Sequence, residues 1–164
     1  AQLQVSVDQE GSEAERFVAL LQSALSMCRA HMANKDGNQP YHYGALGWKM
    51  IGTGEYQKLD GQGPRIGWLD DDCVYLDPKA ALSVIKPLSS QIGNYLGSSE
   101  RAISKALQEA NMLAKYEAGR TTTKVTVEGR RKPLLCLPLN LFIEEDETPP
   151  KETIQPPEQD DFPF

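Results

Sequence analysis

Residues 98–138 decide the fold of this chain, and they read SSERAISKALQEANMLAKYEAGRTTTKVTVEGRRKPLLCLP. Either serine of the pair at 98–99 can cap a helix that runs to about Leu113. Its inner stripe consists of apolar residues at helical spacing: Ile103, Ala106, Leu107, Ala110 and Leu113. The opposite side is polar and basic: Arg101, Ser104, Lys105 and Gln108. We expect one side of this helix to pack on a core and the other to face solvent.

A two-stranded ribbon is predicted after this helix. Residues 121–127 are rich in β-branched side chains, which favours a strand, and a second strand returns over 133–137. The turn between the two strands is basic because it holds Arg130, Arg131 and Lys132. The ribbon therefore has a positively charged tip.

The segments before residue 98 supply the other elements of a small domain. Ser12 can cap a first helix that runs to about residues 31–33. Residues 34–65 are rich in Gly, Tyr and polar side chains, which predicts a long irregular insertion. Two short strands around three aspartates, at 66–69 and 73–76, predict a hairpin. The next helix starts at Asp77-Pro78, and an internal proline at 87 should bend or shorten it.

The order helix, hairpin, helix, helix, hairpin is that of a winged helix-turn-helix. We therefore expect an α+β fold of this type over residues 12–143, with the insertion 34–65 after its first helix. Residues 1–11 are predicted to be a leader. Residues 144–164 are acidic and rich in proline, which predicts a tail that is disordered in isolation.

Charge is distributed unevenly along the chain, whose formal net charge is −6. Residues 144–164 hold eight acids and one base, which gives −7. Residues 98–143 hold eight bases and four acids, which gives +4. A basic segment is thus followed directly by an acidic one, and the asymmetry says more about partners than the total does.

Several functional classes receive no support from the sequence. No apolar run approaches 18 residues, so we expect no membrane span. The three cysteines lack metal-ligand spacing and are predicted to be reduced core thiols of a cytoplasmic protein. With two histidines and no complete catalytic set, we expect no enzyme, no cofactor and no metal site.

A scattered pattern between residues 66 and 137 resembles a known family. It comprises Ile66-Gly67-Trp68, Val74 to Pro78, Ser98 to Arg101, Leu107, Gly119-Arg120-Thr121, Val125, Gly129-Arg130-Arg131 and Leu135-Cys136-Leu137. This pattern resembles the C-terminal winged-helix segments of plasmid- and phage-encoded primase-helicase-type ATPases. The phosphate-cradling motif G-x-x-x-x-G-K-[ST] is absent, so this chain is not the motor. The resemblance implies a detached accessory domain of a mobile-element or phage DNA-replication protein.

The last five residues carry a second resemblance. Asp160, Asp161, Phe162, Pro163 and Phe164 resemble the acidic tip of bacterial single-stranded-DNA-binding proteins. A terminal Phe offers a ring and a free carboxylate to a pocket with an apolar floor and a basic rim. The resemblance implies docking to proteins that ordinarily bind such tips. The alternative is a solubilising acidic tail, or one that folds over the basic wing and screens it.

The leading hypothesis is a DNA-binding module. The expected contacts with single- or double-stranded DNA are Ser99, Arg101, Ser104, Lys105, Arg120, Lys124, Arg130, Arg131 and Lys132. The alternative is a protein-protein docking module that never touches nucleic acid, since winged helices also serve as docking platforms.

Overall fold

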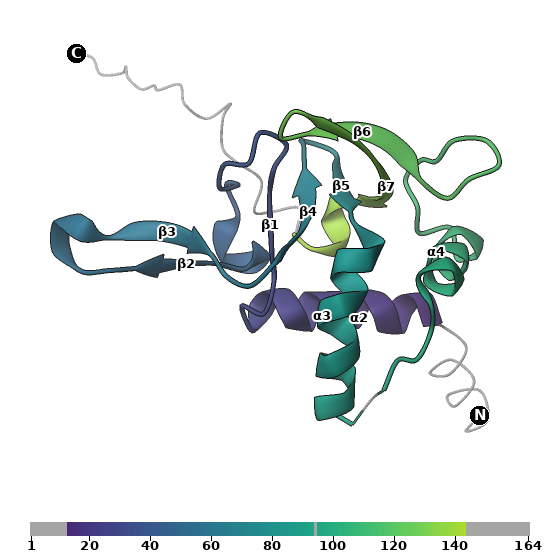
Figure 1. The fold of residues 1–164 in the computed structure, drawn as a ribbon, viewed down its shortest axis with the longest axis horizontal. Helices are drawn as coiled ribbons and strands as arrows, with labels where there is room; N and C mark the ends of the chain where they lie inside the picture. Colours follow the sequence, from purple (N-terminus) through teal and green to yellow (C-terminus); the bar gives the residue numbers. More distant parts are fainter. Residues whose placement is uncertain (1–12, 94, 144–164) are drawn as a thin grey trace, which may run out of the picture.

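The computed structural model describes residues 13–93 and 95–143, which form an α+β domain, so the α+β part of the predicted fold is confirmed (Figure 1). The described helices are α2 (Glu13–Ser26), α3 (Pro78–Gln91) and α4 (Glu100–Glu109). The predicted leader and acidic tail lie outside these residues.

A five-stranded sheet in the order β1-β4-β5-β7-β6 forms the second layer. Its strands are β1 (His31–Asn34), β4 (Arg65–Leu69), β5 (Cys73–Leu76), β6 (Thr123–Val127) and β7 (Arg130–Pro138). Strand β1 is parallel to β4, whereas all other neighbours in this sheet are antiparallel. The predicted hairpin around Asp70 is present as β4–β5.

A separate two-stranded ribbon projects from the body of the domain (Figure 1). It consists of β2 (Trp48–Ile51) and β3 (Lys58–Gly61), and we call it the arm. Short 3₁₀ turns lie at Tyr43–Leu46, at Gly54–Tyr56 and, after β7, at Leu139–Leu141. Trp48 anchors the base of the arm through burial and an indole N–H that donates to the carbonyl of Met32 at 2.7 Å. Met50 and Tyr56 are exposed further out.

The core lies where the three helices meet the sheet. Helix α2 contacts both α3 and α4, and α3 contacts β4. Fully buried aliphatic and aromatic side chains fill this space, including Phe17, Leu21, Ile66, Ile85, Ile103 and Leu107. Each such side chain contributes roughly 1.5–3 kcal/mol when removed from water. Burial on this scale fixes α4, which carries the candidate site, to the rest of the domain.

The starts of α3 and α4 agree with the sequence, whereas the predicted cap Ser12 lies outside the described residues. The Asp77 carboxylate accepts hydrogen bonds from the amides of Lys79 and Ala80, with Pro78 at the first helical position. Helix α3 continues through Pro87 to Gln91, because burial of residues on either side outweighs one missing backbone bond. Of the two candidate serines, Ser99 caps α4 by accepting the amide of Ala102 at 3.1 Å.

The helix ends and the insertion differ from expectation. Helix α2 stops at Ser26, because Cys28 adopts a left-handed φ of 56° and the chain then enters β1. Helix α4 stops at Glu109, and Asn111 follows with a left-handed φ of 59°. The segment predicted as an irregular insertion contains the two paired strands of the arm. Its first residue belongs to β1, and no local sequence pattern reveals that β1 pairs with β4.

We expect Gly47→Ala to destabilise the domain strongly. Gly47 has a φ of 88°, and an added Cβ would lie 2.0 Å from the carbonyl oxygen of Ala30. Strain and steric clash should together lower the free energy of unfolding by about 2 kcal/mol or more in urea titrations. Gly44→Ala is the matched control, since a Cβ there meets nothing within 4 Å. Equal stability of the two variants would contradict the conclusion that the backbone at position 47 requires glycine.

Candidate nucleic-acid interface

An open groove of about 1160 Å³ lies between α4 and the loop that leads into β6. It brings together five of the nine residues predicted to contact nucleic acid: Ser99, Arg101, Ser104, Lys105 and Arg120. Ser99 caps α4, and the next three of these residues come from this helix. Arg120 comes from the opposite wall, where Thr121 and Thr122 follow it. Residues from two separate segments thus face one concave surface.

Hydrogen bonds fix the loop wall of the groove against the helix. The side-chain amide of Gln108 donates to the carbonyl oxygen of Arg120 at 3.1 Å. Within the loop, the amide of Arg120 donates to the carbonyl of Glu117 at 2.9 Å. The Glu117 carboxylate also accepts the amide of Lys124 at 3.2 Å. The position of Arg120 therefore depends on both α4 and the start of β6.

The groove is positively charged. Arg101, Lys105 and Arg120 are exposed, and Glu100 is the acidic residue among the lining side chains. None of the three cations forms an ion pair with a carboxylate of residues 13–93 or 95–143. Cations without a protein partner on a concave, exposed surface can bind an anion from solution.

The two predicted serines also have structural roles. Ser104 is buried, and its hydroxyl donates to the carbonyl of Glu100 at 2.9 Å. Ser99 uses its oxygen as an acceptor for the helix cap. A capping hydroxyl keeps its own proton for donation, so Ser99 can still serve a ligand.

The ribbon tip is divided between two faces. Cross-strand pairs place Lys124 and Arg131 on the outer face, and they place Arg130 and Lys132 on the face that also carries buried Val125 and Val127. The Lys132 ammonium lies 5.0 Å from the ring centroid of Trp68, which is a cation–π contact. Arg130 and Arg131 are exposed at the tip. Lys124 and Arg131 are therefore exposed on the outer face, and Arg130 is exposed at the end of the other face, beside the turn.

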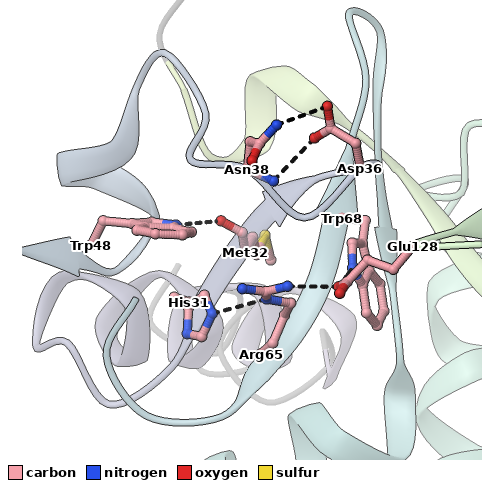
Figure 2. Close-up of polar contacts among 8 residues, drawn as sticks. All are labelled: His31, Met32, Asp36, Asn38, Trp48, Arg65, Trp68 and Glu128. Carbon is pink, nitrogen blue, oxygen red and sulfur yellow. Dashed lines mark hydrogen bonds and ion pairs between the residues drawn. The ribbon is translucent and has the colours of Figure 1, made fainter. Parts of the chain in front are cut away.

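Glu128 ties the ribbon tip to the far edge of the sheet, and no pattern in the sequence singles it out. Its carboxylate accepts from the Arg65 guanidinium at 2.7 Å and from the Trp68 indole N–H at 2.6 Å. Figure 2 shows Glu128 between these two side chains. The amide of Glu128 donates to the carbonyl of Lys35 at 2.7 Å. We call these three contacts the tip clamp. The hydrogen bonds from Trp68 and Arg65 lower the pKa of Glu128 below its ordinary value.

His31 extends the tip clamp towards the arm (Figure 2). Its Nε2 accepts from Arg65 Nε at 3.1 Å, so its Nδ1 must carry the proton that faces the Gln62 carbonyl at 3.1 Å. Its ring also meets the ring of Trp48 edge-on at 5.2 Å. Burial, followed by the charge of Arg65, lowers the pKa of His31. The neutral imidazole is therefore the form that this arrangement requires.

The polar cluster around Asp70 has a structural role, because hydrogen bonds within the protein occupy both of its carboxylate oxygens. One Asp70 oxygen accepts the amides of Asp72 and Cys73, and the other accepts the Tyr75 hydroxyl at 2.8 Å. Within the described ranges, no three His, Cys, Asp or Glu side chains are grouped so that they could hold a metal ion. None of the described helices is both long and apolar enough to cross a membrane.

Comparison with known proteins assigns no relative to this chain. No protein-family model matches it, and neither curated proteins nor solved structures yield a match. The family resemblance inferred from the sequence pattern therefore stays a prediction.

Acidification should destabilise the domain through His31. Because the folded state lowers the pKa of His31, this group contributes stability above its ordinary pKa of 6.5 and loses it as the pH falls. We expect His31→Gln to lose less stability than the parent between pH 7.5 and 5.5, measured by urea titration. The clamp carboxylate Glu128 titrates below its ordinary value of 4.5, outside this window. An identical pH dependence in both proteins would contradict the role of the neutral ring.

Proposed function

We propose that this domain binds DNA through the groove and the exposed face of the β6–β7 ribbon, in the manner of a winged helix. The observation that carries the proposal is the gathering of Arg101, Lys105 and Arg120 around one groove without ion-pair partners among the described residues. A phosphodiester backbone supplies anions at regular spacing, and such cations neutralise them.

The order of elements supports the winged-helix interpretation. Helix α2, strand β5, helices α3 and α4 and strands β6 and β7 follow one another, and β5, β7 and β6 are neighbours in one antiparallel sheet. In a winged helix the corresponding elements are the first helix, a strand, the helix-turn-helix pair and the wing. Here α4 is the recognition helix and β6–β7 is the wing. Strands β1 to β4 are additions between the first helix and the first strand of that core.

The chemistry of α4 suits a phosphate. Arg101 and Lys105 are four residues apart, which places them on the same side of the helix. The positive end of the helix dipole, at Ser99, also favours an anion in the groove. Arg120 approaches from the other wall, so a phosphate bound between them is contacted from two sides.

The biological process that DNA binding would serve is proposed from the resemblance to primase-helicase-type ATPases. A detached winged helix of a primase-helicase-type protein would hold DNA as an accessory domain of a mobile-element or phage replication system. The tip Asp160 to Phe164 would recruit proteins that dock on the tails of single-stranded-DNA-binding proteins. These five residues lie outside the described part of the chain.

A protein-docking function is the second candidate, and the arm favours it. The arm exposes Met50 and Tyr56, and its two lysines are matched by Glu55 and Asp60. A surface with apolar residues and balanced charge suits a protein better than a polyanion. DNA binding that weakens steeply with salt would favour the groove as the functional surface, and its absence would leave the docking function.

Removing two groove cations should weaken DNA binding and its salt dependence. We expect the double variant Arg101→Ala, Lys105→Ala to bind a fluorescent oligonucleotide more weakly, as measured by anisotropy. For each phosphate that the variant no longer neutralises, the slope of log K against log salt should fall by about 0.9 on duplex DNA and by about 0.7 on single strands.

The matched control is the double variant Lys49→Ala, Lys58→Ala. It removes the same charge from the exposed arm, at a distance from the groove (Figure 1). Equal losses of affinity in the two double variants would show that net charge matters and the groove does not, which would contradict the proposed interface.

Deleting residues 144–164 should tighten DNA binding. These residues carry −7 and are tethered to a domain whose groove is basic, so they compete locally with phosphate. The truncated chain should show a lower dissociation constant at low salt, and the difference should shrink as salt rises. Unchanged or weaker binding would exclude screening by the tail.

A further inference from the structure

The turn at the ribbon tip contains an unusual residue for its backbone. Glu128 and Gly129 form the two-residue connection between β6 and β7, and their φ angles are 49° and 80°. Positive φ at both positions is typical of a hairpin turn that favours Asn-Gly, because Asn tolerates the left-handed region better than other side chains. A glutamate there is strained. Such strain persists only where the surrounding contacts compensate for it.

The tip clamp supplies that compensation. The carboxylate of Glu128 has two donors, Arg65 from β4 and Trp68 from the same strand, and its amide is bonded to Lys35 just beyond β1. Its carboxyl group also packs against the turn after β1, where a Cβ added to Gly37 would lie 3.3 Å away. The tip is thereby held against two strands that follow α2 in the chain.

The clamp lies beside the two exposed arginines of the tip. Arg130 follows Gly129 directly, pairs with Val127 across the ribbon and is exposed, as is Arg131. Neither arginine forms an ion pair within residues 13–93 and 95–143. A two-stranded ribbon that is anchored only at its base would let these side chains move relative to the groove. The clamp removes that freedom.

We propose that Glu128 is a positioning residue for nucleic-acid binding, which acts by holding Arg130 and Arg131 in place relative to the groove. This inference rests on the proposed function. The clamp orders the tip before a ligand arrives, so binding does not have to do so. Glu128 itself contacts no ligand, and its effect on affinity passes through the two arginines.

The sign of the effect separates positioning from simple electrostatics. Loss of a carboxylate near a bound polyanion removes repulsion, so charge alone predicts tighter binding in Glu128→Asn. Loss of positioning predicts the opposite, weaker binding by about tenfold. Asn preserves the turn because it favours positive φ, and it is one methylene too short to reach both donors.

The experiment measures DNA affinity by anisotropy for the parent, for Glu128→Asn and for Glu109→Asn. Glu109 is exposed at the end of α4 and belongs neither to the groove lining nor to the clamp, so its variant reports the loss of one charge alone. We expect weaker binding for the first variant and unchanged or slightly tighter binding for the second. Binding by Glu128→Asn that matches the control would overturn the positioning role and leave the proposed function intact.

A double-mutant cycle tests whether the effect passes through the tip. In the background Arg130→Ala, Arg131→Ala, Glu128→Asn should cause no further loss of affinity, whereas an undiminished loss would overturn the proposal. Hydrogen exchange of the indole N–H groups, followed by nuclear magnetic resonance, tests the clamp without DNA. In Glu128→Asn the Trp68 N–H should exchange faster with solvent, while that of Trp48, bonded to the Met32 carbonyl, stays unchanged. If the parent binds no DNA, the proposed function fails and the positioning role fails with it.

Discussion

The hydrogen bonds of the Glu128 carboxylate connect parts of the sheet that strand pairing leaves apart. In the order β1-β4-β5-β7-β6, the strands β1 and β6 are the two edges. The turn at Glu128 reaches back across the sheet, with its carboxylate on β4 and its amide on the carbonyl of Lys35 after β1. The ribbon is therefore held at its tip as well as at its base. This constraint sets where the tip arginines lie relative to α4.

Strand β6 links the two basic areas of the domain. Its first end follows the groove loop with Arg120, and its second end leads into the turn before Arg130. Lys124 lies between them on the outer face. At one end Gln108 fixes the loop to α4, and at the other the tip clamp fixes the turn to β4. Each of the two areas is thus ordered by side-chain hydrogen bonds before a ligand binds, and binding there loses little affinity to ordering.

Local signals in the sequence were sufficient where a structure depends on neighbouring residues. The Asp77-Pro78 start of α3 and the Ser99 cap of α4 are present because capping is decided within four residues. Features that depend on distant partners could not be predicted in this way. Residues 31–34 form β1 through pairing with β4, more than thirty residues later. The contact of Lys132 with the Trp68 ring depends on a residue more than sixty positions away in the chain. Glu128 beside Gly129 is typical of a solvated turn by its sequence, and its ion pair with Arg65 is visible only in the structure.

The net charge of −6 does not argue against the proposed interface, because screening limits the reach of each charge. At physiological ionic strength exposed charges act over about 8 Å, so a phosphate in the groove responds to Arg101, Lys105 and Arg120 rather than to the chain's total. The −7 of residues 144–164 matters in proportion to how close that segment comes to the groove. The short reach of each charge also explains why a basic surface can contain an acidic residue. The charge of Glu128 is directed at Arg65, with the Trp68 N–H as a second donor, and is thus largely neutralised before any phosphate approaches.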